Sequence, residues 1–274
     1  MLLSMVSCRG SSADAPVRVA IDSLVVDSIC PLFRNYSQPA CHIALRLDRP
    51  AATTASTLVS ALEKSLIALP RDGALVADAG GTIEGMANAY IRQFIFQYLL
   101  DGKEAIDSYH GDTESAASWM NYEEVVDGRV LYNEDGFLSY QYTIYSYAGG
   151  AHGNTIVRNC VFDCQHLKPL SLGHLFMSIA LDKVNELLRH KLMSQYGCTT
   201  VEEMTEKTDF FNVADLSATD NFLIDANGVT WTYDPYEIAP YSMGTINISL
   251  SWLEVRQLLL PDSPLKDMAE KYGF

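Results

Sequence analysis

A glycine-rich corner between two strand-like runs constrains this sequence most. Residues 137–146 and 154–162 are both rich in aromatic and β-branched side chains, a composition typical of β-strands. The stretch between them, 147–153, contains three glycines and one histidine, His152. Glycine is favoured where the backbone needs a positive φ angle or approaches another group closely. The corner therefore predicts two consecutive strands joined by either a tight hairpin turn or a binding loop.

Apolar periodicity along the rest of the chain predicts further strands and helices. Cys41, Ile43 and Leu45 alternate with more polar residues, which indicates a half-buried strand. Strands are also expected at 17–28, 118–126, 129–133, 222–224, 229–233 and 245–250, with hairpin turns at 134–136 and 225–228. Apolar residues three or four apart predict helices at 55–69, 84–100, 181–195 and 252–260, the first ended by Pro70. This order predicts an α+β fold, with a largely antiparallel sheet and helices packed on it.

The amino terminus resembles the end of a bacterial lipoprotein signal. An apolar run closes with Ser7 and Cys8 and is followed by small polar residues. The run is short and lacks a basic segment before it, so the alternative is an ordinary frayed terminus. On the lipoprotein interpretation, Cys8 carries the lipid and residues 1–16 are a signal remnant and tether. The protein is then anchored to the bacterial envelope, in the periplasm or on the cell surface.

Composition and charge restrict the domain organisation and the partners. A shift toward β-type composition near residue 115 divides the remaining chain into regions 17–115 and 116–274, which we expect to pack as one body. The net charge of −15 argues against nucleic acid as a partner and would suit a cationic one. Cys30 and Cys41 flank a loop and are able to pair in an oxidising compartment.

Two segments together resemble one known family. The first is the corner at 147–153, and the second is the loop at 233–244. A Gly-Gly-Ala-His-Gly corner, a later Leu-Phe pair and a Pro-Tyr-Glu-Ile-Ala-Pro-Tyr loop are the pattern of the DUF3298 family. Ala148 departs from that pattern, because the family usually has threonine there. Residues 17–115 resemble, more weakly, the DUF4163-like region that accompanies it.

The resemblance implies an extracytoplasmic, envelope-associated protein without an established catalytic role. The family includes Bacteroides-type lipoproteins and the non-catalytic amino-terminal region of some peptidoglycan deacetylases. It also includes the ectodomain of the lysozyme-sensing anti-sigma factor of Bacillus. Lysozyme binding is known for that anti-sigma branch only.

Candidate catalytic and metal-binding residues are few. No sequence signature names catalytic partners for His152, and we expect its ring to brace the corner through a backbone hydrogen bond. Cys160, Cys164 and His166 match zinc-binding spacings only weakly. The glycine corner lacks the lysine of a phosphate-binding loop and precedes a strand. We therefore predict no catalytic residue, no metal site and no cofactor.

The corner and the Tyr-Pro loop form the predicted partner-binding surface. Prolines stiffen the loop and tyrosines offer rigid contact area, although inward packing of the same rings is equally compatible with the sequence. Glu237 is expected to tie the loop to a backbone donor or to His152. The surface contains Tyr147, Gly149, Gly150, His152, Tyr233, Pro235, Tyr236, Glu237, Pro240 and Tyr241.

The predicted function is non-enzymatic binding of a macromolecule by a lipid-anchored envelope protein. The partner is either a lysozyme-like cationic protein or cell-wall glycan, and the acidic charge and the Tyr-Pro loop favour the protein. The alternative is a hydrolase or deacetylase that acts on envelope glycan with His152 in its site.

Overall fold

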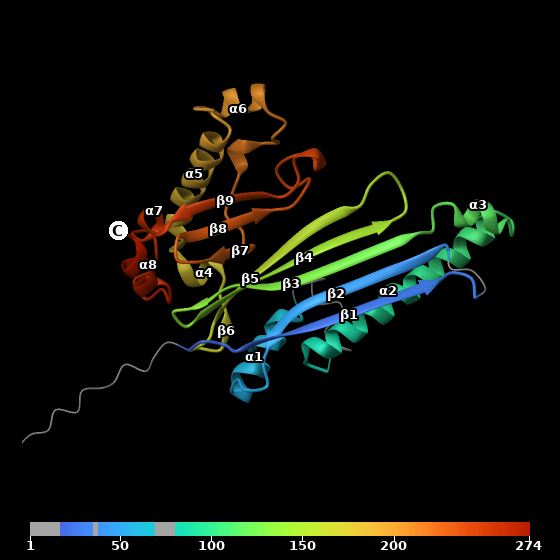
Figure 1. Ribbon diagram of the computed structural model, residues 1–274. Helices are drawn as coiled ribbons and strands as arrows, with labels where there is room; N and C mark the ends of the chain where they lie inside the picture. The colour runs from blue at the N-terminus through green and yellow to red at the C-terminus, as the bar shows by residue number, and fades with distance from the viewer. Residues whose placement is uncertain (1–16, 35–37, 69–79) are drawn as a thin grey trace, which may run out of the picture.

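The computed structural model describes residues 17–34, 38–68 and 80–274, which form two sheets with helices around them (Figure 1). Within these residues the larger sheet contains, in spatial order, β1 (Ile21–Pro31), β2 (Ala40–Pro50), β3 (Tyr122–Glu134), β4 (Phe137–Ala148), β5 (Asn154–Asp163) and β6 (Lys168–Pro169). β2 and β3 are parallel, and the other neighbouring pairs are antiparallel. The smaller sheet is an antiparallel meander of β7 (Phe222–Ile224), β8 (Gly228–Tyr233) and β9 (Ile246–Ser251). The predicted α+β class with a largely antiparallel sheet is confirmed.

One face of the larger sheet is covered by helices that connect β2 to β3. They are α1 (Ser56–Leu66), α2 (Ile83–Ser108) and the short α3 (Thr113–Ala117). A crossover of this kind is what allows two parallel strands to be neighbours. Leu62, Met86 and Tyr90 of the helices pack against inward side chains of the sheet, among them Leu45 and Tyr142. The boundary expected near residue 115 lies in this crossover, so both regions contribute strands to one sheet.

The opposite face of the larger sheet is covered at one end by the carboxyl-terminal part of the chain. This part contains the smaller sheet with α4 (Leu172–Leu175), α5 (Ser178–Gln195), α6 (Val201–Lys207), α7 (Trp252–Val255) and α8 (Lys266–Tyr272). In Figure 1 it stands over the end of the sheet where β4, β5 and β6 meet. Phe137 and Val161 of the larger sheet belong to its core, and Ser139 donates a hydrogen bond to the Ile224 carbonyl at 2.7 Å. Elsewhere on this face, Val25 and Ile29 are exposed.

One predicted pair of strands is a single strand. Residues 118–126 and 129–133 were expected to be separate, but β3 runs through both, with a bulge between Val130 and Tyr132. The Asp-Gly pair at 127–128 resembles a turn in sequence. In the structure, a Cβ at Gly128 would lie 2.3 Å from the Tyr140 hydroxyl oxygen, so this glycine makes room for a packed ring.

The other predicted elements agree with the structure to within a few residues, with two exceptions among the helices, whereas the short α3, α4, α6 and β6 were not predicted. The helix predicted at 84–100 continues to Ser108, because Gly102 packs closely against Leu32 and Ala105 is buried. The helix predicted at 252–260 ends at Val255, and α8 closes the chain instead. Pro70, Cys8 and the tether at 1–16 lie outside the described residues.

Candidate functional site

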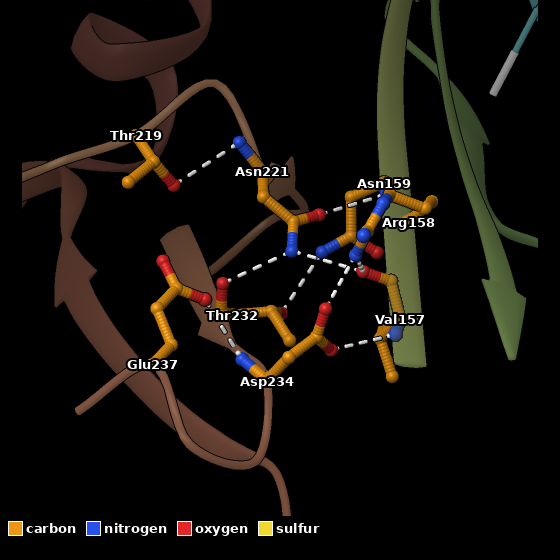
Figure 2. Close-up of polar contacts among 8 residues, drawn as sticks. All are labelled: Val157, Arg158, Asn159, Thr219, Asn221, Thr232, Asp234 and Glu237. Atoms are coloured by element: carbon orange, nitrogen blue, oxygen red, sulfur yellow. Dashed lines mark hydrogen bonds and ion pairs between the residues drawn. The ribbon is translucent and has the colours of Figure 1, made fainter. Parts of the chain in front are cut away.

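The outward edge of β5 is closed by side chains from the carboxyl-terminal part (Figure 2). Asp234 accepts a hydrogen bond from the Val157 backbone N–H at 2.7 Å through Oδ1, and its Oδ2 forms an ion pair with Arg158 Nη1. Asn221 accepts from the Asn159 N–H at 2.9 Å and donates to the Val157 carbonyl at 3.0 Å. Two side chains thus take the place of a neighbouring strand along this stretch of β5. We call these contacts the polar junction.

A chain of side-chain hydrogen bonds, buried at its centre, extends the polar junction across both sheets. Gln141 donates to Asn159 at 3.0 Å, and Asn159 donates to the Thr232 hydroxyl at 2.8 Å. Thr232 in turn donates to Asn247 at 2.9 Å. Asn159 and Thr232 are buried. Because buried polar groups are costly unless they are paired, this chain favours one specific arrangement of β4, β5, β8 and β9.

The polar junction positions the loop at 234–244, which follows β8. Glu237 Oε2 accepts a hydrogen bond from the Asp234 N–H at 2.9 Å, so the tie expected of Glu237 goes to a backbone donor. Tyr236 has a φ angle of 71° and donates its N–H to the Ala239 carbonyl at 2.8 Å. A left-handed backbone costs a residue with a side chain about 1–2 kcal/mol. The loop therefore holds the Tyr236 ring outward at an energetic cost that its hydrogen bonds offset.

The glycine corner is a hairpin connection between β4 and β5. Gly149 and Gly150 have φ angles of 78° and 101°, and the Tyr147 hydroxyl donates to the Gly150 carbonyl at 3.0 Å. Gly153 lies against the ring of Tyr145, where a Cβ would come within 2.4 Å of a ring carbon. The first two glycines are therefore needed for the backbone conformation and the third for close packing.

The corner and the loop meet through three stacked rings, which we call the aromatic stack. The His152 and Tyr241 ring centroids are 4.0 Å apart with an interplanar angle of 19°. The Tyr241 and Tyr236 centroids are 6.0 Å apart at 26°. His152 also hydrogen-bonds through Nδ1 to the Gly153 carbonyl at 2.9 Å. His152 and Tyr236 are exposed, the latter by 58%, and Tyr241 is partly exposed, so the stack presents aromatic surface to solvent.

The remaining predicted contact residues are divided between the surface and the core. Pro235 and Pro240 are half-buried and Glu237 is exposed in the loop. Tyr233 is only 1% exposed, and its hydroxyl donates to the Ser217 carbonyl at 2.8 Å. Burial, together with the charge of Glu237, raises the pKa of Tyr233. The prediction that Tyr233 contacts a partner is wrong, because β8 is the central strand of its sheet and this ring fills the core beside it.

The two cysteines considered for zinc binding, Cys160 and Cys164, are buried in the apolar core. Burial raises the pKa of the Cys160 thiol and of the Cys164 thiol to about 12. His166 follows the end of β5 and is paired with the Asp163 carboxylate at 2.7 Å. Across residues 17–34, 38–68 and 80–274, no group of three or more His, Cys, Asp or Glu side chains is placed to hold a metal ion.

A cavity of about 290 Å³ lies beside the loop, on the side of α5 and residues 210–219. Phe210, Val213 and Leu216 provide apolar walls, and Asp215 and Glu237 add carboxylates at exposed positions. An apolar cavity with acidic groups is suited to a side chain that has an aliphatic stem and a cationic end.

Sequence reasoning missed the residues of the polar junction. Asp234 precedes a proline and Asn221 precedes a short strand, so both look like ordinary turn residues in the sequence. Arg158 looks like a solvated residue on an alternating strand. Their roles depend on contacts between residues more than sixty positions apart.

Together these observations define a class of protein, a two-part α+β protein that exposes an aromatic stack beside a polar junction. Residues 174–252 match the family described as protein of unknown function, DUF3298, so the chain carries the DUF3298 domain that was predicted. The expected domain, 116–274, is longer than the match, and the glycine corner lies outside it. Residues 45–155 match the family described as deacetylase PdaC. His152 lies in the second match and Tyr241 in the first, so the aromatic stack is built from both matched regions.

Two solved structures share the fold. A DUF3298 family member from Bacteroides fragilis superimposes with a TM-score of 0.80 and 23% identity, over 94% of this chain and 100% of its own. A DUF3298 family protein from Pseudomonas aeruginosa gives a TM-score of 0.60 and 15% identity, over 89% of this chain and 95% of its own. No curated protein matches the sequence. In the described part of the chain, no helix has both the length and the apolar character needed to cross a membrane.

Proposed function

We propose that this protein binds a macromolecular partner, without catalysis, through the aromatic stack and the loop at 234–244. The observation that carries the proposal is the stacking of His152 on Tyr241, which joins the corner to the loop in one exposed surface. Rigid, partly exposed aromatic rings are the usual anchors of interfaces, because they bury a large area and lose little conformational entropy. The loop is already ordered by Glu237 and the polar junction, which lowers the cost of docking further.

The partner that the surface suits best is a cationic protein of the lysozyme type. The chain has a net charge of −15, which would attract a basic partner over a distance. The cavity beside Glu237 supplies apolar walls and carboxylates for a lysine or arginine side chain of such a partner. Cell-wall glycan is the other candidate, because sugar rings also pack on aromatic side chains.

The binding experiment compares the wild type with Tyr236→Ala and Tyr241→Ala against lysozymes of differing net charge. We expect affinity to fall by at least about tenfold in each variant, because interface anchors typically contribute about 2 kcal/mol or more. Affinity should also fall as salt rises. Tyr109→Ala is the matched control, because Tyr109 is an exposed tyrosine at the end of α2, on the other side of the sheet.

Two results would decide against parts of this proposal. Folded Tyr236→Ala and Tyr241→Ala proteins that bind as tightly as the wild type would remove the loop from the interface. Binding to soluble peptidoglycan fragments, with none to any lysozyme, would make glycan the partner.

The proposed location is the bacterial envelope, with Cys8 as the lipid anchor. The support is the apolar-Ser-Cys junction in the sequence, followed by small polar residues. Labelling with a fatty-acid analogue, in cells that express the native leader, should tag the wild type and spare Cys8→Ser. Equal labelling of the two would contradict the anchor.

A second candidate is a deacetylase or hydrolase that acts on envelope glycan, with His152 in its site. The observation that favours it is the match of residues 45–155, which include the corner, to a family named for a deacetylase. The test is acetate release from N-acetylated glycan, by the wild type and by His152→Ala. Turnover that disappears in His152→Ala while the fold is retained would replace the binding proposal.

A further inference from the structure

Two cysteines lie directly opposite each other on the first two strands. Cys30 of β1 is in register with Cys41 of β2. The ladder continues beyond them, because the Leu32 N–H donates to the Pro39 carbonyl at 2.9 Å. Because pairs two residues apart along a ladder are of the same kind, Cys30 and Cys41 form a hydrogen-bonded pair, in which the Cα atoms are about 5.5 Å apart and the side chains lie on the same face. A disulfide needs a Cα separation of about 4.4–6.8 Å, so the two strands already hold these residues at bridging distance.

The other described cysteines are placed differently. Cys160 lies opposite Tyr140 in the β4–β5 register. Cys164 follows the end of β5 and packs with the core under α1 and α2. Cys198 lies beyond α5 in the carboxyl-terminal core. Among residues 17–34, 38–68 and 80–274, Cys30 and Cys41 are therefore the cysteines that the strand register sets against each other.

The two thiols differ in access to solvent. Cys41 is fully buried in a small core with Tyr98, Met120 and Tyr122, whereas Cys30 is partly exposed at its margin. Burial, and then the proximity of Cys30, raises the pKa of Cys41 to about 12. Because the thiolate is the reactive form, the accessible Cys30 is the one that meets an external oxidant first.

We propose that Cys30 and Cys41 form an intramolecular disulfide when the protein is in an oxidising compartment. The oxidant is a small-molecule or protein disulfide. The Cys30 sulfur attacks it and releases one thiol, and the Cys41 sulfur then displaces the second thiol from the mixed disulfide. One S–S bond forms between the cysteines and the S–S bond of the oxidant breaks. The two electrons and the two cysteine protons leave on the two thiols of the reduced oxidant.

The disulfide would link the edge strand β1 to β2 at the end of the sheet that carries the glycine corner. Cys30, Cys41, Tyr122 and Ala148 form one row in register across β1, β2, β3 and β4. Ala148 is the last residue of β4 before the glycines of the corner. The bridge therefore fixes β1 to β2 in the same row from which the corner extends. It does not depend on what the aromatic stack binds.

The test uses the full-length protein, refolded or incubated with oxidised glutathione and then alkylated under denaturing conditions. Peptide mapping by mass spectrometry should find one linked pair that contains Cys30 and Cys41. The oxidised protein should melt at a higher temperature than the reduced protein, because the closed loop restricts the unfolded chain. Oxidation should be faster during refolding than in the folded protein, since Cys41 is then accessible.

Matched variants make the outcome decisive. Cys30→Ser, at the partly exposed position, should remove both the linked peptide and the shift in melting temperature. Cys198→Ser should leave both unchanged. Alkylation of Cys30 and Cys41 at full yield after oxidation, or a link from either to a different cysteine, would overturn the proposal. A linked pair with no change in melting temperature would show that the disulfide does not stabilise the fold.

Discussion

Replacing Asp234 by alanine tests the polar junction most directly. The change removes the carboxylate that accepts from the Val157 N–H and pairs with Arg158. A hydrogen bond to a charged group contributes about 1.5–3 kcal/mol, and breaking a buried ion pair costs about 3–5 kcal/mol. The Asp234 side chain is 14% exposed and that of Arg158 is 33% exposed, so solvent screens the pair in part. We therefore expect the free energy of unfolding to fall by about 2–4 kcal/mol.

The assay is thermal unfolding followed by circular dichroism, with urea unfolding for the free energy. For a protein of this size, the loss corresponds to a melting temperature lower by about 4–8 °C. Asp234→Asn keeps an acceptor for the Val157 N–H, so its melting temperature should lie between those of the wild type and Asp234→Ala. Asp262→Ala, at an exposed acidic residue of the same part of the chain, is the control. An Asp234→Ala protein that melts within about 1 °C of the wild type would refute the reasoning.

Three further predictions concern other contacts. Gly128→Ala should lower stability by about 1–3 kcal/mol, because the methyl group would meet the Tyr140 hydroxyl at 2.3 Å, and an unchanged melting temperature would contradict this. Although burial opposes it, hydrogen bonds from Lys271 and two tyrosines hold the pKa of Asp135 below its ordinary value of 3.8. The free energy of unfolding should thus be higher for the wild type than for Asp135→Asn, with the full difference present above about pH 5 and a smaller one as pH falls through the lowered pKa. A difference that does not change with pH would count against the ionised contact. His152→Ala should cost only about 1 kcal/mol in urea unfolding, because the ring is exposed, and a loss above about 3 kcal/mol would show that it braces the fold.

Local patterns made most elements of the fold predictable. The alternation from Cys41 to Leu47 and the apolar spacing of α5 depend on neighbours in the sequence, and both elements lie where they were expected. The parallel pairing of β2 with β3 was not predictable in this way. It places Cys41 beside Tyr122 only because the intervening helices return the chain to the same edge.

The candidate site was predictable in its parts and not in its contacts. The corner and the loop were identified from glycine, proline and tyrosine content, but stacking of His152 on Tyr241 depends on how the two sheets are joined. The inward position of Tyr233 was not evident from the sequence, because both faces of β8 are covered. Asp234 carried no signal of its own, since an Asp-Pro pair is common in turns.

Closing a strand edge with side chains also bears on how these molecules behave toward one another. An edge with unpaired N–H and C=O groups is a template on which a strand of another chain can add, and repetition of that step produces polymers. Asn221 and Asp234 occupy such groups on β5 from Val157 to Asn159. Unlike a strand, a side chain presents no second row of backbone N–H and C=O groups, so no further strand can pair beyond it. The residues that hold the two parts of one molecule together thereby help to keep separate molecules apart.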